Sequence, residues 1–209
     1  MEIVIANTDH LDYAQIISDT IADSAKQRGT GIAKRTPEYI EKKMRSGNAV
    51  IALDGDNFAG FCYIETFGQK NFVVHSGLIV HPSYRKLGLA KKIKTRVFNH
   101  SREKYPGAKV FGITTGLAVM KINYELGYKP VTFSELTDDP EFWKGCQTCQ
   151  NYDVLQRTNQ KMCLCTGMLY DGQKEKVQKH PFDSSVLSRL KRIKQSLFLK
   201  KSINKIKKK

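Results

Sequence analysis

Apolar residues follow two spacings along the chain, and these spacings predict the order of its elements. Alternating or continuous apolar residues indicate strands, whereas apolar residues three or four positions apart indicate helices. The predicted strands are 1–6, 49–53, 58–67, 72–80, 110–114, 128–133 and 162–169. The predicted helices are 9–22, 37–45, 89–104 and 117–126. The order βααβββαβαββ indicates a mixed α/β (α+β) fold with a three-stranded antiparallel meander and no internal repeat.

Charge divides the chain near Asp171. Residues 1–171 carry 22 basic and 18 acidic side chains, a net charge of +4, whereas residues 172–209 carry 13 and 2, a net charge of +11. We therefore predict a folded domain over 1–171 and a basic amphipathic helical tail over 172–209. A domain at +4 needs no nucleic-acid partner. The tail is suited to RNA or to an anionic membrane, or to packing on its own domain or remaining solvated.

The compartment is predicted from two further features. The longest apolar runs fall short of the ~20 residues of a membrane-spanning helix. The first ten residues have neither the basic start nor the apolar core of a secretory signal. We expect a cytoplasmic protein whose five cysteines are reduced.

A turn between an apolar strand and a helix has the residues that favour a bound phosphate. It is Arg85-Lys86-Leu87-Gly88-Leu89-Ala90-Lys91, after a strand that ends at Val80. Gly88 and the small Ala90 let a ligand approach the backbone, and the free N–H groups at a helix start favour an anion. Without its spacing, this turn is also typical of an ordinary strand–helix connection.

The spacing Arg85-x-x-Gly88-x-Ala90 resembles the acyl-CoA signature Q/R-x-x-G-x-G/A of the GNAT N-acetyltransferases. The order of elements is similar to that family's over roughly residues 1–170. The resemblance implies the GNAT fold, a mixed and mostly antiparallel sheet flanked by helices. It also implies an N-acyltransferase whose co-substrate is acetyl-CoA or another short acyl-CoA.

The resemblance further implies a role for individual residues. Two neighbouring strands splay into a V, in which the acyl thioester meets the amine. The residues that hold the CoA pyrophosphate through backbone N–H groups are Lys86, Leu87, Gly88, Leu89, Ala90 and Lys91. Leu78 and Val80 present main-chain groups to the pantetheine arm.

Attack of an amine on a thioester requires a base for the amine. Glu65 is one candidate, because burial among apolar residues disfavours the charged form of a carboxyl group. Its alternative is a cross-strand salt bridge. His75 is the other candidate, one position away from Ser76 and Val74, where the family often has its base. A strand bulge would restore it to the site, and its alternative is a structural histidine.

The same reaction requires a proton for the leaving thiolate. The family commonly has a Tyr four residues before the Gly of an L-G-F/Y helix end. Leu126-Gly127-Tyr128 matches that end, but the Tyr position holds Asn123. Tyr124 follows, rotated about 100° around the helix, so it remains a candidate acid beside a water-assisted alternative.

Five segments look like the acetyltransferase domain of N-acetylglutamate synthases or like small stand-alone GNAT proteins associated with bacterial arginine biosynthesis. They are VHPSYR at 80–85, GYKPV at 127–131, NYDVLQR at 151–157, TGIAKR at 30–35 and FSELTDD at 133–139. This resemblance implies the α-amine of L-glutamate as the acceptor, with acetyl or succinyl as the acyl group. Candidate cations for the two glutamate carboxylates are Arg28, Lys34, Arg35 and Arg157.

Two other function classes stay open at this stage. The chain could be a GNAT enzyme that acetylates protein or RNA amines recruited by the basic tail. It could also be a non-catalytic acyl-CoA-binding module, because its base and acid are unclear. Homodimer formation is open as well.

Four cysteines form two close pairs, Cys146-x-x-Cys149 and Cys163-x-Cys165. Four thiolates suffice for a tetrahedral structural zinc site, and residues 163 and 165 share a face if they lie in a strand. The alternative is that they are small core residues. Cys62, on a strand among aromatic residues, is predicted to lie in the core.

Overall fold

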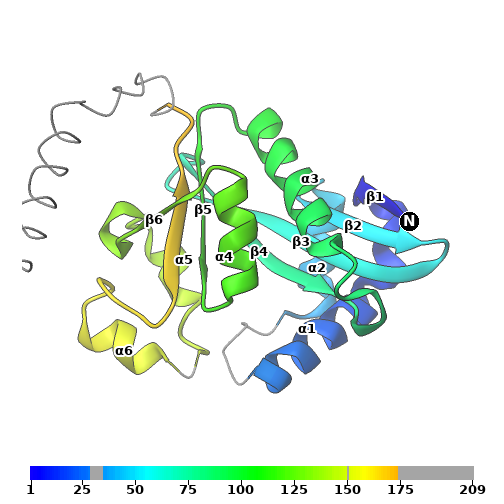
Figure 1. The fold of residues 1–209 in the computed structure, drawn as a ribbon, viewed down its shortest axis with the longest axis horizontal. Coiled ribbons are helices and arrows are strands. Elements are labelled where there is room, and N and C mark those ends of the chain that lie inside the picture. The colour runs from blue at the N-terminus through cyan, green and yellow to red at the C-terminus, as the bar shows by residue number, and fades with distance from the viewer. Residues whose placement is uncertain (29–34, 150, 174–209) are drawn as a thin grey trace, which may run out of the picture. The chain divides into compact units, whose positions relative to one another are not determined.

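The strands of the chain form one seven-stranded sheet, in the order β1-β2-β3-β4-β5-β7-β6 (Figure 1). The computed structural model describes residues 1–28, 35–149 and 151–173. The strands are β1 Glu2–Ile5, β2 Ala49–Asp54, β3 Asn57–Phe67, β4 Phe72–Val80, β5 Lys109–Thr114, β6 Lys129–Val131 and β7 Thr166–Tyr170. All neighbours are antiparallel except β4 and β5, which are parallel. The predicted mixed, mostly antiparallel sheet is confirmed.

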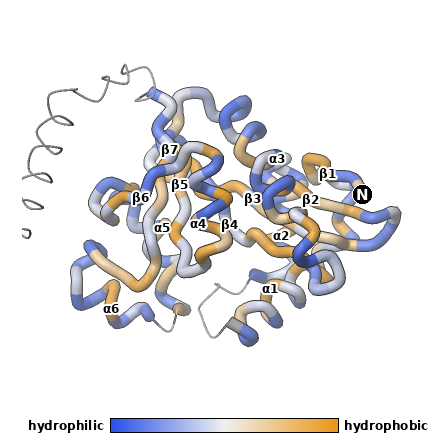
Figure 2. Tube along the Cα trace, viewed as in Figure 1, coloured by the Kyte–Doolittle hydropathy of each residue, from blue (hydrophilic) through white to orange (hydrophobic). Residues whose placement is uncertain are grey.

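Helices cover both faces of this sheet. They are α1 Ala14–Arg28, α2 Pro37–Arg45, α3 Leu89–Lys104, α4 Leu117–Glu125, α5 Pro140–Lys144 and α6 Tyr152–Arg157. The apolar residues of α1 and α2 pack on one face of β2 and β3, and those of α3 pack on the other face. Figure 2 shows the hydrophobic stretches of β2, β3 and β4 between these helices. Burial of both faces explains why the strands are apolar along most of their length.

Helix α2 forms where its sequence signals indicate. The Thr36 side chain accepts a hydrogen bond from the Tyr39 backbone N–H, and Pro37 holds the first helical position. Ile40 and Met44, four residues apart, are both buried. Capping and apolar spacing therefore agree on the same nine-residue helix.

The C-terminal part of the sheet differs from the predicted elements. Residues 140–144 and 152–157 form short helices that the apolar spacing does not reveal. Strand β6 is shorter than predicted, and β7 begins at Thr166 rather than at Met162. Each short helix buries only one or two side chains, so the apolar period is too brief to be recognised.

Residues Met1–Gly172 form one compact unit. The predicted basic tail lies outside the described residues from position 174 onward. Within the part of the chain that the structure describes, no helix is long and apolar enough to cross a membrane.

Candidate active site

Strands β4 and β5 separate along their length and open a V in the middle of the sheet. They pair only at Phe72–Val74 and Lys109–Phe111, although both strands continue beyond these residues. A cavity of about 270 Å³ lies there, lined by His75–Leu78 of β4 and Gly112–Thr114 of β5. Polar side chains reach this cavity from both faces of the sheet. Such a cleft can hold two reactants that approach from opposite faces.

A bulge in β4 shapes one wall of the V. The β3–β4 register shifts between Phe61 and Tyr63, so that Ser76 pairs with Tyr63 and Ile79 pairs with Phe61. Gly77 occupies the extra position with φ +62°. A Cβ atom there would overlap the Tyr63 ring. Glycine is therefore required at 77 both by backbone conformation and by the neighbouring ring.

The turn before α3 has the geometry that the phosphate prediction requires. Gly88 is the N-cap of α3, with φ +74°, and it is exposed together with Lys86 and Leu87. A Cβ atom at Gly88 would meet nothing within 4 Å, so the space in front of this helix start is open. Leu89 is buried and anchors the turn on the core. Open N–H groups at the start of a 16-residue helix favour a bound anion.

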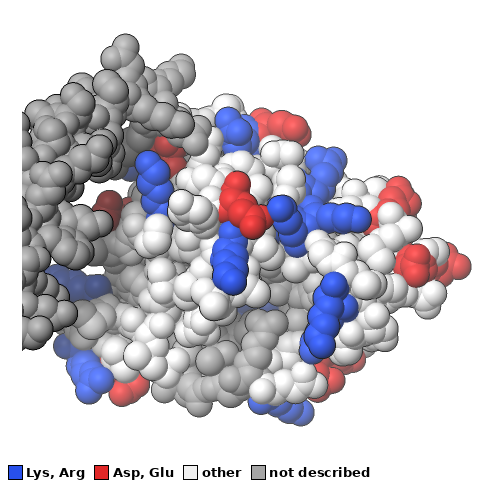
Figure 3. Space-filling view, in the orientation of Figure 1, with Lys and Arg blue, Asp and Glu red and all other residues white. Residues whose placement is uncertain are grey.

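Arg85, the first residue of the signature, is held by its neighbours. Its Nε donates a hydrogen bond to the Val80 carbonyl oxygen over 3.2 Å, and its Nη2 donates to the Ser24 hydroxyl over 3.2 Å. It therefore joins the end of β4 to α1. Lys91 forms an ion pair of 2.7 Å with Glu125 of α4. Figure 3 shows basic side chains spread over this face with acidic side chains among them.

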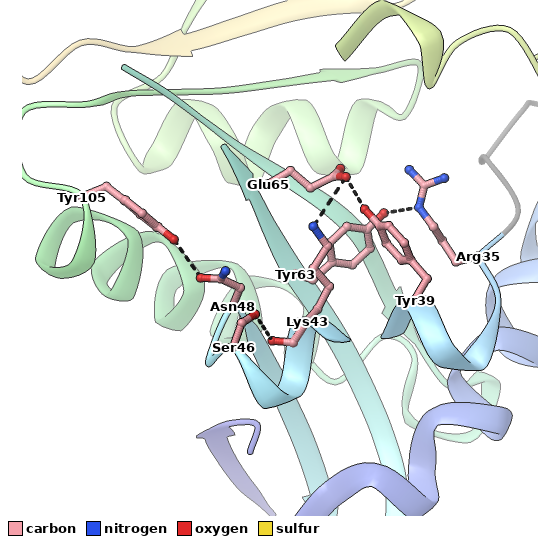
Figure 4. A network of polar contacts seen from close by, with 8 residues as sticks. All are labelled: Arg35, Tyr39, Lys43, Ser46, Asn48, Tyr63, Glu65 and Tyr105. Carbon is pink, nitrogen blue, oxygen red and sulfur yellow. Dashed lines mark hydrogen bonds and ion pairs between the residues drawn. The ribbon is translucent and has the colours of Figure 1, made fainter. Parts of the chain in front are cut away.

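A network of charged and aromatic side chains converges on the opposite face of the V (Figure 4). Arg35 and Glu65 both line the cavity. The Arg35 Nε donates a hydrogen bond of 2.6 Å to the Tyr63 hydroxyl, and the Tyr39 hydroxyl donates to Glu65. The Nζ of Lys43 lies 3.7 Å from Glu65 Oε1. The site therefore holds a guanidinium and a carboxylate side by side in a half-buried setting.

The electrostatics of the network follow from this geometry. Burial opposes the charge of Arg35, but nearby Tyr63 and Glu65 outweigh it and raise the pKa of Arg35. Burial lowers the pKa of Lys43, which Glu65 partly offsets. Burial and the hydrogen bond to Glu65 raise the pKa of Tyr39, so its hydroxyl stays protonated as a donor. The predicted salt bridge of Glu65 exists, but to α2 instead of across the sheet.

His75 lies on the face of β4 that packs on α3, because the bulge follows it and does not change its facing. It is 8% exposed. The Tyr128 hydroxyl lies 3.1 Å from Nδ1, and Nε2 lies 2.8 Å from the Ser101 hydroxyl, which itself donates to the Val97 carbonyl. All three of these hydrogen bonds form when neutral His75 accepts at Nδ1 and donates at Nε2. Burial lowers its pKa well below the ordinary value. The structure thus favours the structural role over the base role.

The bulge in β4 does not bring His75 to the predicted base position, because of where it lies in the strand. It lies at Gly77, after His75, so it changes the facing of Leu78 and the residues beyond. Ser76 and Val74 keep the face of Tyr63 and Glu65, to which their pairing partners belong. Both of them line the cavity.

The two acid candidates on α4 point in different directions. Asn123 is 1% exposed and lines the cavity, with its Oδ1 buried and without a hydrogen-bond partner among the described residues. Tyr124 is 70% exposed and is not part of the cavity wall. The prediction of Tyr124 as the acid is wrong in this geometry, because one residue of helical rotation carries its hydroxyl into solvent.

Among the other predicted substrate cations, the side chain that the structure describes is that of Arg157, and it does not join Arg35. Arg157 ends α6, is exposed and is not part of the cavity wall. Lys34 lies outside the described residues, and so does the side chain of Arg28 at the end of α1. Arg35 is the predicted cation that the described structure places at the V.

The four cysteines of the two pairs converge on the cavity wall near α5 and α6. Burial, together with the neighbouring thiols, raises the pKa of Cys146 to about 11 and that of Cys165 to about 12. Within residues 1–28, 35–149 and 151–173, no group of three or more His, Cys, Asp or Glu side chains has an arrangement that holds a metal ion. The residues therefore do not fit the predicted zinc site.

The zinc prediction fails because Cys163 and Cys165 do not lie in a strand. Cys163 and Cys165 precede β7, which begins at Thr166, so the shared strand face expected for them is absent. They pack instead on an aromatic cluster that includes Phe142 and Trp143. Cys62 is fully buried, as predicted for a core residue.

Sequence reasoning missed Lys94 on α3, and Tyr39 and Lys43 on α2. Lys94 is buried and lines the cavity. The spacing along α3 could have revealed that Lys94 is buried, because residues 94, 97, 98 and 101 follow the spacing of one buried helix face. Tyr39 and Lys43 are four residues apart on α2 and share a face toward Glu65.

Comparisons with known proteins place this architecture. The model of the Acetyltransferase (GNAT) family matches residues 14–121. No curated protein matches the chain. Among solved structures, N-acetylglutamate synthase from Neisseria gonorrhoeae, complexed with coenzyme A and N-acetyl-glutamate, has a TM-score of 0.57 at 16% identity. That similarity covers 81% of this chain and 34% of the synthase, so the chain spans about a third of its length.

Two further solved structures cover nearly the whole of their own chains. A Mycobacterium tuberculosis protein in complex with CoA has a TM-score of 0.57 at 14% identity, covering 82% of this chain and 99% of that one. The protein yncA from Salmonella typhimurium, solved with its cofactor acetyl-CoA, has a TM-score of 0.55 at 14% identity, covering 87% and 96%. At these identities the likeness shows the fold alone.

Proposed function

Because the chain belongs to the GNAT acetyltransferase family, and is therefore an acyl-CoA-dependent N-acyltransferase, we propose that its acceptor is the α-amine of L-glutamate. The donor is acetyl-CoA or succinyl-CoA. The N-acylated glutamate belongs to arginine biosynthesis in this proposal. The synthase of Neisseria gonorrhoeae supports the choice of acceptor, since it was solved with N-acetyl-glutamate.

One observation carries the proposal: Arg35 and Glu65 line the same cavity. An amino acid presents a carboxylate and an amine, and the site presents a guanidinium and a carboxylate to match them. Arg35 is fixed by Tyr63 and also lies 5.0 Å from the centroid of the Tyr39 ring. A guanidinium held in this way suits a carboxylate, because its planar donors match both oxygens.

The residues of this chain divide the reaction between the two faces of the V. Backbone N–H groups of the turn Lys86–Lys91 bind the phosphates of the donor at the start of α3. The separated edges of β4 and β5 leave unpaired main-chain groups for the pantetheine arm. On the other face Arg35 orients the acceptor, and Glu65 takes the proton of the amine. Tyr39 and Lys43 hold the Glu65 carboxylate in position.

The test mixes purified full-length protein with acetyl-CoA or succinyl-CoA, with and without L-glutamate, and follows release of the free CoA thiol. Glutamate-dependent release with one donor supports the proposal and identifies the acyl group. Glutamine, which lacks the second carboxylate, serves as the matched control. Equal rates with both amino acids would contradict glutamate as the specific acceptor.

Two other results point to the competing functions. If protein that binds CoA in a calorimeter releases no thiol with any amine, the chain is an acyl-CoA-binding module. If release requires a protein or RNA acceptor and is lost when residues 172–209 are deleted, the tail recruits the substrate.

A further inference from the structure

Lys94 is buried on the donor side of the cavity. It lies on α3 and is 2% exposed, and it lines the cavity together with Leu78 and Asn123. Its place in the helix is six residues after Gly88, or about 9 Å along the axis at 1.5 Å per residue. A donor held by its phosphates at the start of α3 therefore passes this side chain on its way into the V.

The groups around Lys94 provide no negative charge. It faces Cys62 of β3, His75 of β4 and Tyr128, whose ring centroid lies 5.4 Å from Nζ. Burial raises the pKa of Cys62 to about 11 and that of Tyr128 well above its ordinary value, so both stay neutral. Among the described residues, no carboxylate forms an ion pair with Lys94.

A buried ammonium group without a counter-ion is costly for the folded protein. An apolar side chain would pack at this position without that cost. The two acid candidates on α4 meanwhile do not supply the proton for the thiolate, because Asn123 has an amide at the usual Tyr position and Tyr124 is 70% exposed. Lys94 and Asn123, the residue at the usual acid position, line the same cavity.

We propose that Lys94 is the catalytic acid of this enzyme, and that its Nζ donates the proton to the CoA sulfur as the thiol leaves. The proposal rests on the acyl-transfer function proposed above, but it does not depend on which amine is the acceptor. Asn123, whose buried Oδ1 has no hydrogen-bond partner in the described part of the chain, lines the same wall and is available to orient the ammonium group or the donor.

The step balances in protons and electrons. The amine nitrogen forms a bond to the thioester carbonyl carbon, the C–S bond breaks, and its electron pair stays on sulfur. Sulfur takes one proton from Lys94 Nζ, and the amine loses one proton to Glu65. Exchange with solvent returns a proton to Lys94 and removes one from Glu65, so that amide and CoA thiol are the net products.

The acidity of Lys94 suits this role. Burial lowers its pKa from 10.5 to about 8, with Cys62 acting in the opposite direction. An ordinary thiol has a pKa of about 8.5. Because the two groups are of similar acidity, proton transfer between them involves only a small difference in free energy.

The first experiment does not require any amine. The thiolate of CoA bound to the full chain is titrated by its ultraviolet absorbance, in the wild type and in Lys94→Met. A nearby ammonium group stabilises the thiolate, so the bound thiol should titrate at least about one pH unit lower in the wild type. Equal titration curves in two variants that both bind CoA would overturn the proposal.

The second experiment measures kinetics over pH. Lys94→Met should lower kcat by about 10²–10⁴-fold with a nearly unchanged Kd for CoA, and should remove the fall in kcat above about pH 8. Lys94→Arg should not restore activity, because a guanidinium does not release its proton. Lys121→Met, at an exposed position of α4 outside the cavity wall, is the matched control.

Three kinetic outcomes would overturn the proposal. Restoration by Lys94→Arg would show that only charge is needed, and loss of CoA binding in Lys94→Met would show a packing or binding role. A loss confined to succinyl-CoA would show that Lys94 binds the acyl carboxylate. If the wild type itself releases no thiol with glutamate, the proposed acceptor fails, while the thiol titration still decides the role of Lys94.

Discussion

The Nε atom of Arg35 donates a hydrogen bond of 2.6 Å to the hydroxyl group of Tyr63, a residue of the central strand β3. Arg35 directly precedes α2, whereas Tyr63 is packed in the core beside the β4 bulge. This contact ties the cation of the proposed acceptor site to a buried residue of the sheet. Preorganisation of this kind reduces the entropy lost when a carboxylate binds.

Tyr63→Phe should therefore raise the KM for the acceptor by about tenfold with a smaller change in kcat, since it removes one hydrogen bond of the Arg35 guanidinium but leaves the ring in the core. Steady-state kinetics of thiol release measure both constants. Tyr105→Phe is the matched control: it removes a hydrogen bond of 2.9 Å to Asn48 in the same network, away from the cavity. A similar rise in KM for both variants would contradict the specific role of Tyr63.

Glu65→Gln should lower kcat by about 10²–10⁴-fold at every pH, because an amide cannot take the proton of the amine. The Kd for CoA should stay unchanged, since the donor binds on the other face. Glu41→Gln, at a half-buried position of α2 that pairs with Arg45 and lies outside the cavity wall, should keep full activity. Thermal unfolding of both variants separates loss of the base from loss of the ion pair with Lys43. Full activity of Glu65→Gln would exclude Glu65 as the base.

Gly88→Ala should weaken CoA binding by about tenfold or more, because its Cβ narrows the approach to the N–H groups at the start of α3. The matched control is Gly55→Ala in the β2–β3 turn. Both glycines have positive φ, +74° and +58°, and both face open space. Each substitution should cost about 1–2 kcal/mol of unfolding free energy. Calorimetry with CoA should separate them, and equal CoA affinities would contradict the predicted phosphate site.

Lys94→Met should raise the unfolding free energy at pH 7 by up to about 3 kcal/mol while it lowers activity. The pKa of Lys94 is about 8 in the folded protein against an ordinary 10.5. Below pH 8 both states of the wild type are protonated, and the folded state holds the buried charge. Between pH 8 and 10.5 the folded state loses its proton first, so wild-type stability rises with pH relative to the variant.

Denaturant unfolding of the wild type and Lys94→Met over this pH range measures the difference. The difference in unfolding free energy between the wild type and Lys94→Met should disappear as the pH approaches 10.5. A variant less stable than the wild type at pH 7 would indicate that the Lys94 ammonium stabilises the fold, through its contact with the Tyr128 ring.

The sequence by itself determined the order of the main elements, the meander and the glycine turn before α3. These features depend on local spacing: apolar residues of β2 to β4, capping of α2 by Thr36, and glycine at the start of α3. Local interactions are encoded within a few residues, so a pattern reveals them. The short helices α5 and α6 escaped because they bury too few side chains for a period to form.

The tertiary structure alone decided which side chains meet at the V. His75 faces α3 because the bulge follows it and leaves its alternation unchanged, Tyr124 turns outward by one helical step, and Cys163 and Cys165 lack the strand face expected for a metal. Arg35 reaches Tyr63 from a position 28 residues away, and Lys94 joins Asn123 in the cavity wall from a different helix. The physical reason is that burial and contact between distant segments are set by how whole elements pack, and a local pattern does not contain that information.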